Sequence, residues 1–298
     1  MTQGYPNLDL LCFGEPMVEL MAQNQTPPLR FQQNFGGDTA NTAVAAARQG
    51  AMVGYICALG DDLFGQAFID LWHQEAIDTQ AVVRNPQANT GIYLVQPHGE
   101  QRNFTYYRQH SAASQFSAAD LPLDYIKQAR HMHVSAISQA ISQSMQEATL
   151  AALKYAQSQG LGTSYDTNLR LTLWASKEQA WQCMQTAMAY TDTLFPSLDE
   201  ITLLTGISDK DAIIDLCLAL GPSLVVLKCG AQGAYLGTPT QRLSIPAVET
   251  KAVDSTGAGD AFAGAFLAAQ LAGASLAECG QRAAKVASNT VSGYGALA

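Results

Sequence analysis

The sequence predicts an α/β fold, in which a parallel β-sheet carries helices on its faces and a small β-sheet forms a lid. Short apolar runs alternate with helical stretches along the chain, which is the βαβα order of a parallel sheet. Two segments, residues 16–35 and 90–108, alternate polar and apolar residues instead, as antiparallel strands with one solvated face do. No linker or repeat divides the chain. We therefore expect one domain over residues 1–298, with these two segments meeting as the lid.

Composition and charge restrict the class of protein. Of the 298 residues, 48% are hydrophobic and 14% charged, which indicates a packed globular chain. Sixteen Lys and Arg against twenty-five Asp and Glu give a net charge of −9, so we expect neither a nucleic-acid partner nor an anionic membrane surface. The N-terminus has no secretory signal pattern, and residues 261–277 are too weakly hydrophobic for a membrane span, so a buried helix is expected there.

The cysteines and histidines predict no metal site. None of the six cysteines forms a CxxC or CxxxC pair, which favours reduced core thiols in a cytoplasmic protein. His131 and His133 share one face of a predicted strand, but a third ligand at suitable spacing is missing. We therefore expect both to be polar core residues.

The expected elements follow from hydrophobic periodicity and helix-end signals. Gly160, for example, is a C-terminal cap that ends a long crossover helix. Strands are expected at 8–14, 52–60, 131–137, 161–168, 193–197 and 223–230, and helices at 38–50, 64–76, 143–160 and 177–190.

The segment from Asp254 to Phe266 carries the clearest chemical signal. Glycines two positions apart let the backbone N–H groups of Gly257, Ala258 and Gly259 face open space at the start of an apolar helix, where the helix dipole favours a phosphoryl oxyanion. A carboxylate beside a phosphate is repelled by it, so Asp260 suggests a base that deprotonates the attacking hydroxyl. The alternative is that Asp260 only stabilises a helix N-terminus.

Other phosphate motifs are missing. No GxxxxGK[ST] occurs, and Gly14-Glu15-Pro16 follows the first strand where a dinucleotide-binding fold would have GxGxxG. The expected phosphate site is therefore C-terminal.

Three segments together resemble the two signatures of the ribokinase-like (PfkB) carbohydrate kinase family. They are residues 36–41 (GGDTAN), 60–65 (GDDLFG) and 254–266, in the family's order. The resemblance implies a three-layer α/β/α sandwich with a β-sheet lid, ATP and Mg²⁺ as cofactors, and phosphorylation of a sugar hydroxyl. It makes Asp260 the catalytic base and residues 257–259 the anion hole, and it leaves open whether a monovalent cation is required.

The same resemblance assigns the nucleotide side. Residues 227–233 are similar to the family's strand and glycine turn beneath the nucleotide, although a simple hairpin turn is the alternative. Where most relatives have Asn-x-x-Glu, this chain has Ser197 and Glu200, and Glu200 is expected to hold Mg²⁺ through water. The residues assigned to the nucleotide are Asn168, Ser197, Lys228, Gly230, Gly233, Gly257, Gly259 and Asn289.

Two arginines decide the expected substrate. Arg108 ends the second lid segment, and Arg170 follows a buried strand at the sheet edge where ligands bind in open α/β folds. Guanidinium groups match planar carboxylates, and both contexts resemble the 2-keto-3-deoxygluconate kinase subgroup. The alternative for both is an arginine at the surface or beside the phosphates. By this resemblance the sugar-acid contacts are Gly36, Asn41, Tyr93, Tyr106, Arg108 and Arg170.

The expected function is therefore ATP-dependent phosphorylation of a sugar acid, 2-keto-3-deoxygluconate, to its 6-phosphate. The alternatives are a fructokinase or another neutral-sugar kinase of the same fold, and a catalytically silent sugar-binding regulator. We also expect a homo-oligomer that forms through the lid.

Overall fold

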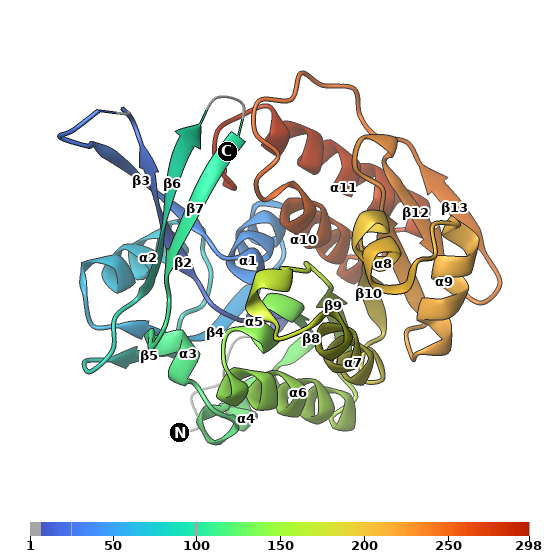
Figure 1. Cartoon of the computed structure of the whole chain (residues 1–298). Coiled ribbons are helices and arrows are strands. Elements are labelled where there is room, and N and C mark those ends of the chain that lie inside the picture. The colour runs from blue at the N-terminus through green and yellow to red at the C-terminus, as the bar shows by residue number, and fades with distance from the viewer. Residues whose placement is uncertain (1–6, 25, 99–100, 298) are drawn as a thin grey trace.

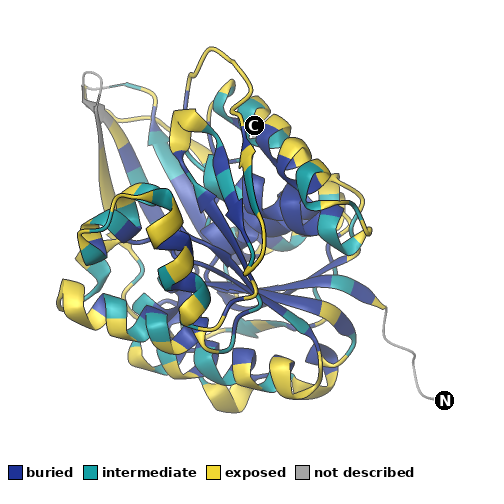
Figure 2. Cartoon of the chain, turned by 90° about the vertical axis from the view of Figure 1, so that its right-hand side faces the viewer, coloured by how far each residue is buried: buried dark blue, intermediate teal, exposed yellow. Residues whose placement is uncertain are grey.

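The body of the protein is a nine-stranded sheet between two layers of helices (Figures 1 and 2). The computed structural model describes residues 7–24, 26–98 and 101–297, so the ends of the expected 1–298 domain lie outside the described residues. The strand order is β13-β12-β11-β10-β9-β8-β1-β4-β5, and all strands run parallel except β12, which is antiparallel to both of its neighbours. The strands are β1 (Leu8–Phe13), β4 (Val53–Gly60), β5 (Val82–Asn85), β8 (Ala129–Ser135), β9 (Gly162–Asp166), β10 (Thr193–Phe195), β11 (Leu224–Lys228), β12 (Ala234–Gly237) and β13 (Arg242–Ile245).

Each face of the sheet has its own hydrophobic core. The core on one face is closed by α1 (Asp38–Arg48), α2 (Leu63–Gln74), α10 (Ala258–Leu271) and α11 (Leu276–Val291). The core on the other face is closed by α3 (Ala112–Gln115), α4 (Leu123–Ile126), α5 (Ala136–Ala140), α6 (Gln143–Ser158), α7 (Lys177–Met188), α8 (Leu198–Thr205) and α9 (Lys210–Ala219). In Figure 2 the central strands of the sheet are mostly dark blue because both of their faces are buried, whereas the outer sides of the helices are yellow. The predicted α/β/α sandwich is confirmed.

Local signals explain where several elements end. Ser142 caps α6 by accepting a hydrogen bond from the Met145 N–H at 3.1 Å, and Gly160 lies just beyond the helix with a φ of +75°. The strand expected at 131–137 ends two residues early. Its last residue, Ser135, accepts from the Ser138 N–H at 3.3 Å and so starts α5.

Residues 261–277 divide between two helices, α10 and α11, and the part within α10 is largely buried. No helix in the described part of the chain is both long enough and apolar enough to cross a membrane. His131 and His133 are buried on β8, and His133 Nδ1 lies 2.9 Å from Ser164 Oγ. Burial lowers the pKa of His131 to about 4 and that of His133 to about 3, so both are neutral in the core.

A separate four-stranded sheet, which we call the lid sheet, lies at upper left in Figure 1. Its strands, in the order β3-β2-β6-β7, are β2 (Met17–Ala22), β3 (Phe31–Gly36), β6 (Gly91–His98) and β7 (Gln101–Tyr107). Each of the two segments forms an antiparallel pair, as expected, but β2 and β6 pair in parallel. The reason is that both strands start where the chain leaves the body, so they run outward together.

The arrangement of the body fixes where a site can form. β1, β8, β9, β10 and β11 are parallel, so their carboxyl ends meet at one edge of the sheet. The lid sheet starts at this edge, because β2 follows β1 directly.

Candidate active site

The N-terminus of α10 has the geometry of an anion site. Gly257 caps the helix in the left-handed region, with a φ of +75°, and a Cβ there would clash with Ala296, so only glycine fits. Of the expected amides, the Ala258 N–H already makes a long bond, 3.3 Å, to the Ser255 carbonyl. Asp254 holds the turn by accepting from the N–H groups of Thr256 and Gly295, each at 3.0 Å.

Asp260 lies in the first turn of α10, between two amide side chains. Asn41 Nδ2, on α1, donates to Asp260 Oδ2 at 2.8 Å, and Asn168 Nδ2, which follows β9, lies 3.5 Å from Asp260 Oδ1. Burial, and next the negative charge of Asp38, raise the pKa of Asp260 to about 7. A carboxyl group with this pKa can accept a proton near neutral pH, as a general base must.

Lys228 brings a positive charge to the same helix end. Its ammonium donates to both carboxylate oxygens of Asp166, at 2.8 and 2.6 Å, and both side chains are largely buried. Burial lowers the pKa of Lys228, but the carboxylates of Asp166 and Glu200 offset this, and the pKa is raised overall. A Cβ on Gly259 would be 3.5 Å from Lys228 Nζ, so the ammonium lies beside the expected anion hole.

Glu200, on α8, binds the loop that follows β9. Its Oε1 accepts from the Leu169 N–H at 2.8 Å and its Oε2 from Thr167 Oγ1 at 2.5 Å. No group of three or more His, Cys, Asp or Glu side chains in the described residues forms a metal site. Kinases, however, usually hold Mg²⁺ with one or two carboxylates and the nucleotide phosphates. The carboxylates of Asp166 and Glu200, whose charges act on Lys228 beside the α10 N-terminus, fit that pattern as a pair.

Two acidic residues of this cluster had no assigned role in the sequence. Asp38 accepts from Asn168 Nδ2 at 3.1 Å and from the Thr39 N–H at 2.8 Å, and Asp166 also accepts from the Asn168 N–H at 3.0 Å. Asp38 stands in the 36–41 segment, directly after a glycine pair, and Asp166 stands near the end of the strand expected at 161–168. Carboxylates at such positions are the signal that would have found them.

The lid sheet contributes an aromatic group. Tyr93 is buried on β6, and its hydroxyl donates to Glu19 Oε2 at 2.8 Å. Gly36 leaves room for this ring, because a Cβ there would clash with the Tyr93 hydroxyl. Tyr106 on β7 has its ring centroid 5.7 Å from that of Tyr93 and is 45% exposed.

The two arginines are in different surroundings. Arg108 is largely buried and forms an ion pair with Glu15, a residue to which the sequence assigned no role. Its guanidinium also lies 5.7 Å from the centre of the Tyr106 ring. Arg170 is exposed, and its Nη1 donates to the Leu169 carbonyl at 3.0 Å.

The glycines expected beneath the nucleotide form the turn between β11 and β12. Gly230 and Gly233 both have positive φ, and a Cβ on Gly233 would clash with the Ile245 carbonyl. Ser197 is the N-cap residue of α8, and its backbone forms a bridge with Lys228. These contacts place both segments next to Lys228, and their role toward a nucleotide stays a prediction.

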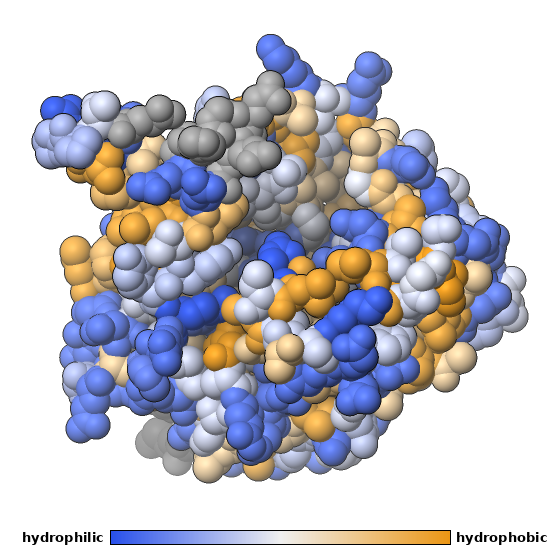
Figure 3. Space-filling model, in the orientation of Figure 1, coloured by the Kyte–Doolittle hydropathy of each residue, from blue (hydrophilic) through white to orange (hydrophobic). Residues whose placement is uncertain are grey.

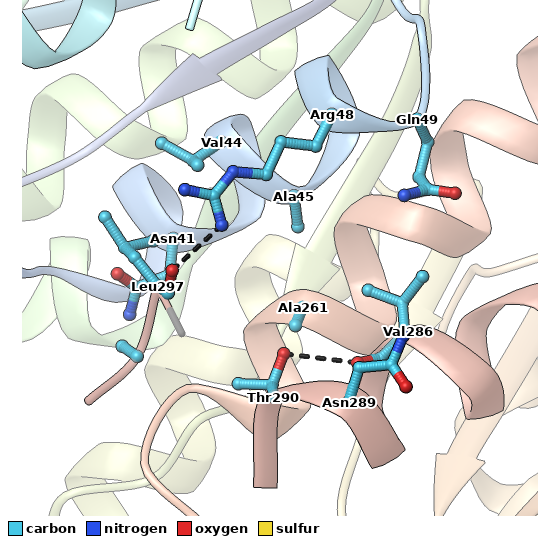
Figure 4. A pocket seen from close by; sticks show the side chains of 11 residues that line it. Asn41, Val44, Ala45, Arg48, Gln49, Ala261, Val286, Asn289, Thr290 and Leu297 are labelled. Atoms are coloured by element: carbon cyan, nitrogen blue, oxygen red, sulfur yellow. Dashed lines mark hydrogen bonds between the residues drawn. The ribbon is translucent and has the colours of Figure 1, made fainter. Parts of the chain in front are cut away.

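Asn289 lies in the lining of a pocket of about 160 Å³ between α1, α10, α11 and the C-terminal segment (Figure 4). Asn41 lines the same pocket, in which Arg48 reaches the Leu297 carbonyl at 2.9 Å. Asn41 Oδ1 is buried and has no hydrogen-bond partner among the described residues, so it can accept from a ligand.

Figure 3 shows a hollow between the lid sheet and the C-terminal half of the body, with hydrophilic side chains at its floor. The α/β/α body with a lid, the helix N-terminus beside a lysine, and the carboxyl group with a raised pKa are together the features that phosphoryl transfer requires.

Comparisons with known proteins give the family. The pfkB family of carbohydrate kinases matches residues 7–298, and this chain belongs to it. It is 32% identical to "2-dehydro-3-deoxygluconokinase" of Bacillus subtilis (strain 168), over 92% of this chain and 87% of that protein. It is also 32% identical to "Probable fructokinase-5" of Arabidopsis thaliana, over 87% and 81%.

Solved structures agree with this family. A PfkB protein from Polaromonas sp. JS666 superimposes with a TM-score of 0.89 at 29% identity, covering 97% of each chain. A putative ribokinase II from E. coli in complex with ATP and Mg²⁺ gives 0.88 at 26% identity, covering 97% of this chain and 94% of that one. The predicted family resemblance is thus confirmed, and the protein is a carbohydrate kinase.

Proposed function

We propose that this carbohydrate kinase phosphorylates a sugar acid, 2-keto-3-deoxygluconate, on its primary hydroxyl to give the 6-phosphate. The observation that carries the proposal is Asp260, whose pKa is about 7 and which accepts a hydrogen bond from Asn41 in the first turn of the helix whose Gly259 lies beside Lys228. The proposed substrate follows from the relative named 2-dehydro-3-deoxygluconokinase. The sugar acid in that name, 2-dehydro-3-deoxygluconate, is another name for 2-keto-3-deoxygluconate.

Asp260 and the group formed by residues 257–259 with Lys228 would have different tasks. Asp260 would take the proton of the acceptor hydroxyl, while the amides of residues 257–259 and the Lys228 ammonium would bind the transferring phosphoryl group. ATP is the proposed donor, and Mg²⁺ would neutralise charge on its phosphates, in line with the ATP and Mg²⁺ complex of the E. coli neighbour. Glu200 would hold that ion through water.

The remaining assignments follow the same division. Toward the nucleotide we propose Asn168, Ser197, Gly230, Gly233 and Asn289. Toward the sugar acid we propose Gly36, Asn41, Tyr93, Tyr106, Arg108 and Arg170. Asn41 is the best supported of these, because its free Oδ1 and its bond to Asp260 would let it bind a hydroxyl beside the base.

A neutral-sugar kinase is the second candidate, and one observation favours it. Arg108 already has a carboxylate partner in Glu15, so its charge does not require a substrate carboxylate. Preference for a sugar acid then depends mainly on Arg170, which is exposed and has no carboxylate within its described contacts. The fructokinase relative has the same level of identity as the sugar-acid kinase.

We further propose a cytoplasmic enzyme, supported by six free cysteines, of which five are buried. Assembly through the lid sheet is supported by large exposed side chains on it, such as Phe104 and Tyr107. A requirement for a monovalent cation stays a prediction from the family resemblance.

A coupled ADP-release assay on a panel of acceptors tests the function. The panel is 2-keto-3-deoxygluconate, its galactose-derived epimer, fructose, ribose and adenosine, each with ATP and Mg²⁺. We expect the highest kcat/KM on one of the two sugar acids. A higher value on fructose would establish the second candidate, and activity on none of the five would reject both.

A further inference from the structure

All four connections between the body and the lid sheet meet at Glu15. At the base of the lid sheet, Met17 pairs with Gly36 on one side and with Gly91 on the other, and Tyr107 pairs with Ile92. Beyond these paired residues, the chain passes between the lid sheet and the body in the connections β1–β2, β3–α1, β5–β6 and β7–α3. Glu15 lies two residues before β2, in the connection from β1.

Glu15 lies on one of the four connections and contacts residues of the other three. Its carboxylate is fully buried, forms the ion pair with Arg108 after β7, and accepts from Ser111 Oγ at 3.0 Å. A Cβ on Gly91 would be 2.9 Å from Glu15 Oε1, and a Cβ on Gly37, after β3, would clash with the Glu15 carbonyl. Gly91 therefore lets the chain pass close to this carboxylate, and Gly37 lets it pass close to the Glu15 backbone.

Breaking the buried ion pair of Glu15 with Arg108 should be costly in free energy. Removing one member of a buried pair leaves an uncompensated charge, which typically costs far more than an exposed pair contributes. Arg108 has donors left over, because its Nε is buried and has no hydrogen-bond partner among the described residues. The same guanidinium lies against Tyr106, at the face of the lid sheet that carries Tyr93.

We propose that Glu15 is a positioning residue for the sugar acceptor: through Arg108 it fixes the base of the lid sheet and directs the remaining guanidinium donors toward the acceptor site. The nucleotide-side residues Lys228 and Gly257 lie on other elements and take part in none of the contacts just named. The proposal depends on the carbohydrate kinase family and on no particular acceptor, so it is tested with whichever sugar the panel identifies.

The test is Glu15→Gln, which keeps the size of the side chain and removes the charge. We expect KM for the acceptor to rise about tenfold or more, as the loss of a charge-assisted contact implies, while KM for ATP changes less than about twofold. In a double-mutant cycle with Arg108→Gln, the double variant should lose about as much as Arg108→Gln alone, because Glu15 acts through Arg108. Glu15→Asp should restore part of the acceptor affinity.

Asp192→Asn is the matched control. Asp192 holds Thr163 in the body through two hydrogen bonds, at 2.8 and 3.0 Å, and lies on a connection away from the lid sheet. The control should lower Tm and leave both KM values unchanged, which separates loss of stability from loss of positioning.

Two results would overturn the proposal: equal rises in the two KM values for Glu15→Gln, or independent losses that multiply in the double variant. If Glu15→Gln does not fold, Ser111→Ala decides instead, because it removes one neutral hydrogen bond to the same carboxylate. We then expect acceptor KM to rise about two- to fivefold with ATP KM unchanged. An unchanged acceptor KM would reject the positioning role.

Discussion

The proposed active site has two halves that are built differently. In the phosphoryl-transfer half, Asp260, Asp166 and Lys228 are fixed by hydrogen bonds to one another or to Asn41 and Asn168, and helices and strands of the body carry them. In the acceptor half, Tyr106 is 45% exposed and Arg170 is exposed on a loop. The groups assigned to the chemistry are thus already held in place, whereas several groups assigned to recognition are not.

This difference indicates which half of the proposed site is determined by the fold of the body. Electrostatic stabilisation is effective when donors and charges are oriented before the reaction, and rigid elements do this better than loops. Recognition of one sugar among many can be changed on a loop without disturbing that network. Variants of the first half should therefore change the rate or the stability, and variants of the second half should change the choice of acceptor.

Asp260→Asn should have the largest effect. The amide keeps the shape but cannot accept the hydroxyl proton, and loss of a positioned base costs about 10²- to 10⁴-fold. We expect kcat to fall in that range while the binding of sugar and ATP, measured by calorimetry, stays close to wild type. A variant that kept more than about a tenth of the wild-type kcat would show that Asp260 is not the base.

Lys228→Met should lower the stability of the fold in addition to the rate, because the same ammonium is proposed to bind the transferring phosphoryl group. Without the ammonium, the buried carboxylate of Asp166 has no counter-charge, which costs about 3–5 kcal/mol when a buried pair is broken. Denaturant unfolding measures this loss. Lys154→Met on α6 is the control, because Lys154 is exposed and its replacement should stay within about 0.5 kcal/mol. Similar losses for the two variants would mean that the Lys228–Asp166 pair contributes little.

Arg170→Ala tests the acceptor half. If Arg170 binds a substrate carboxylate, kcat/KM on the sugar acid should fall about 10- to 100-fold, as expected for a hydrogen bond to a charged group. Activity on fructose should fall much less, because fructose has no carboxylate. Arg170→Lys should recover only part of the loss, since an ammonium lacks the two-pronged geometry. Equal losses on both sugars would assign Arg170 to the phosphates or to the fold.

The pH dependence should show the smallest change. With the pKa of Asp260 at about 7, kcat/KM should fall about tenfold per pH unit below pH 7 and level off above it. The raised pKa also means that the folded state binds this proton more tightly, so the stability from this group is lost as the pH rises through 7. Asp260→Asn should abolish that decrease in Tm, which extends from about pH 4, near the ordinary pKa of an aspartate, to about pH 7. A profile that is flat from pH 5 to 8 would contradict the raised pKa.

The sequence predicted the body well because its signals are local. The apolar run of β1 and the glycines before α10 act within a few residues, and both were found at the expected places. The ion pair of Glu15 with Arg108 was not predicted, since it joins residues that only the topology brings together. A single glutamate before a proline carries no local sign of burial.

The direction in which the lid strands pair could not be predicted from the sequence either. Alternation of polar and apolar residues predicts a strand with two different faces, but it does not specify which neighbour the strand pairs with or in which direction. The sequence therefore predicted the antiparallel pairs inside each segment, and the parallel contact of β2 with β6 appeared only in the structure.

That parallel contact has a consequence for how the chain folds. An isolated two-stranded hairpin is at best marginally stable in water, and β2 with β3 is such a hairpin until β6 arrives from a distant part of the sequence. Closing so long a loop costs entropy that local contacts do not repay. We expect the body strands β1 and β4 to gain protection from hydrogen exchange first during refolding, and the lid sheet to gain it last, so that the capacity to bind sugar returns after the fold of the body.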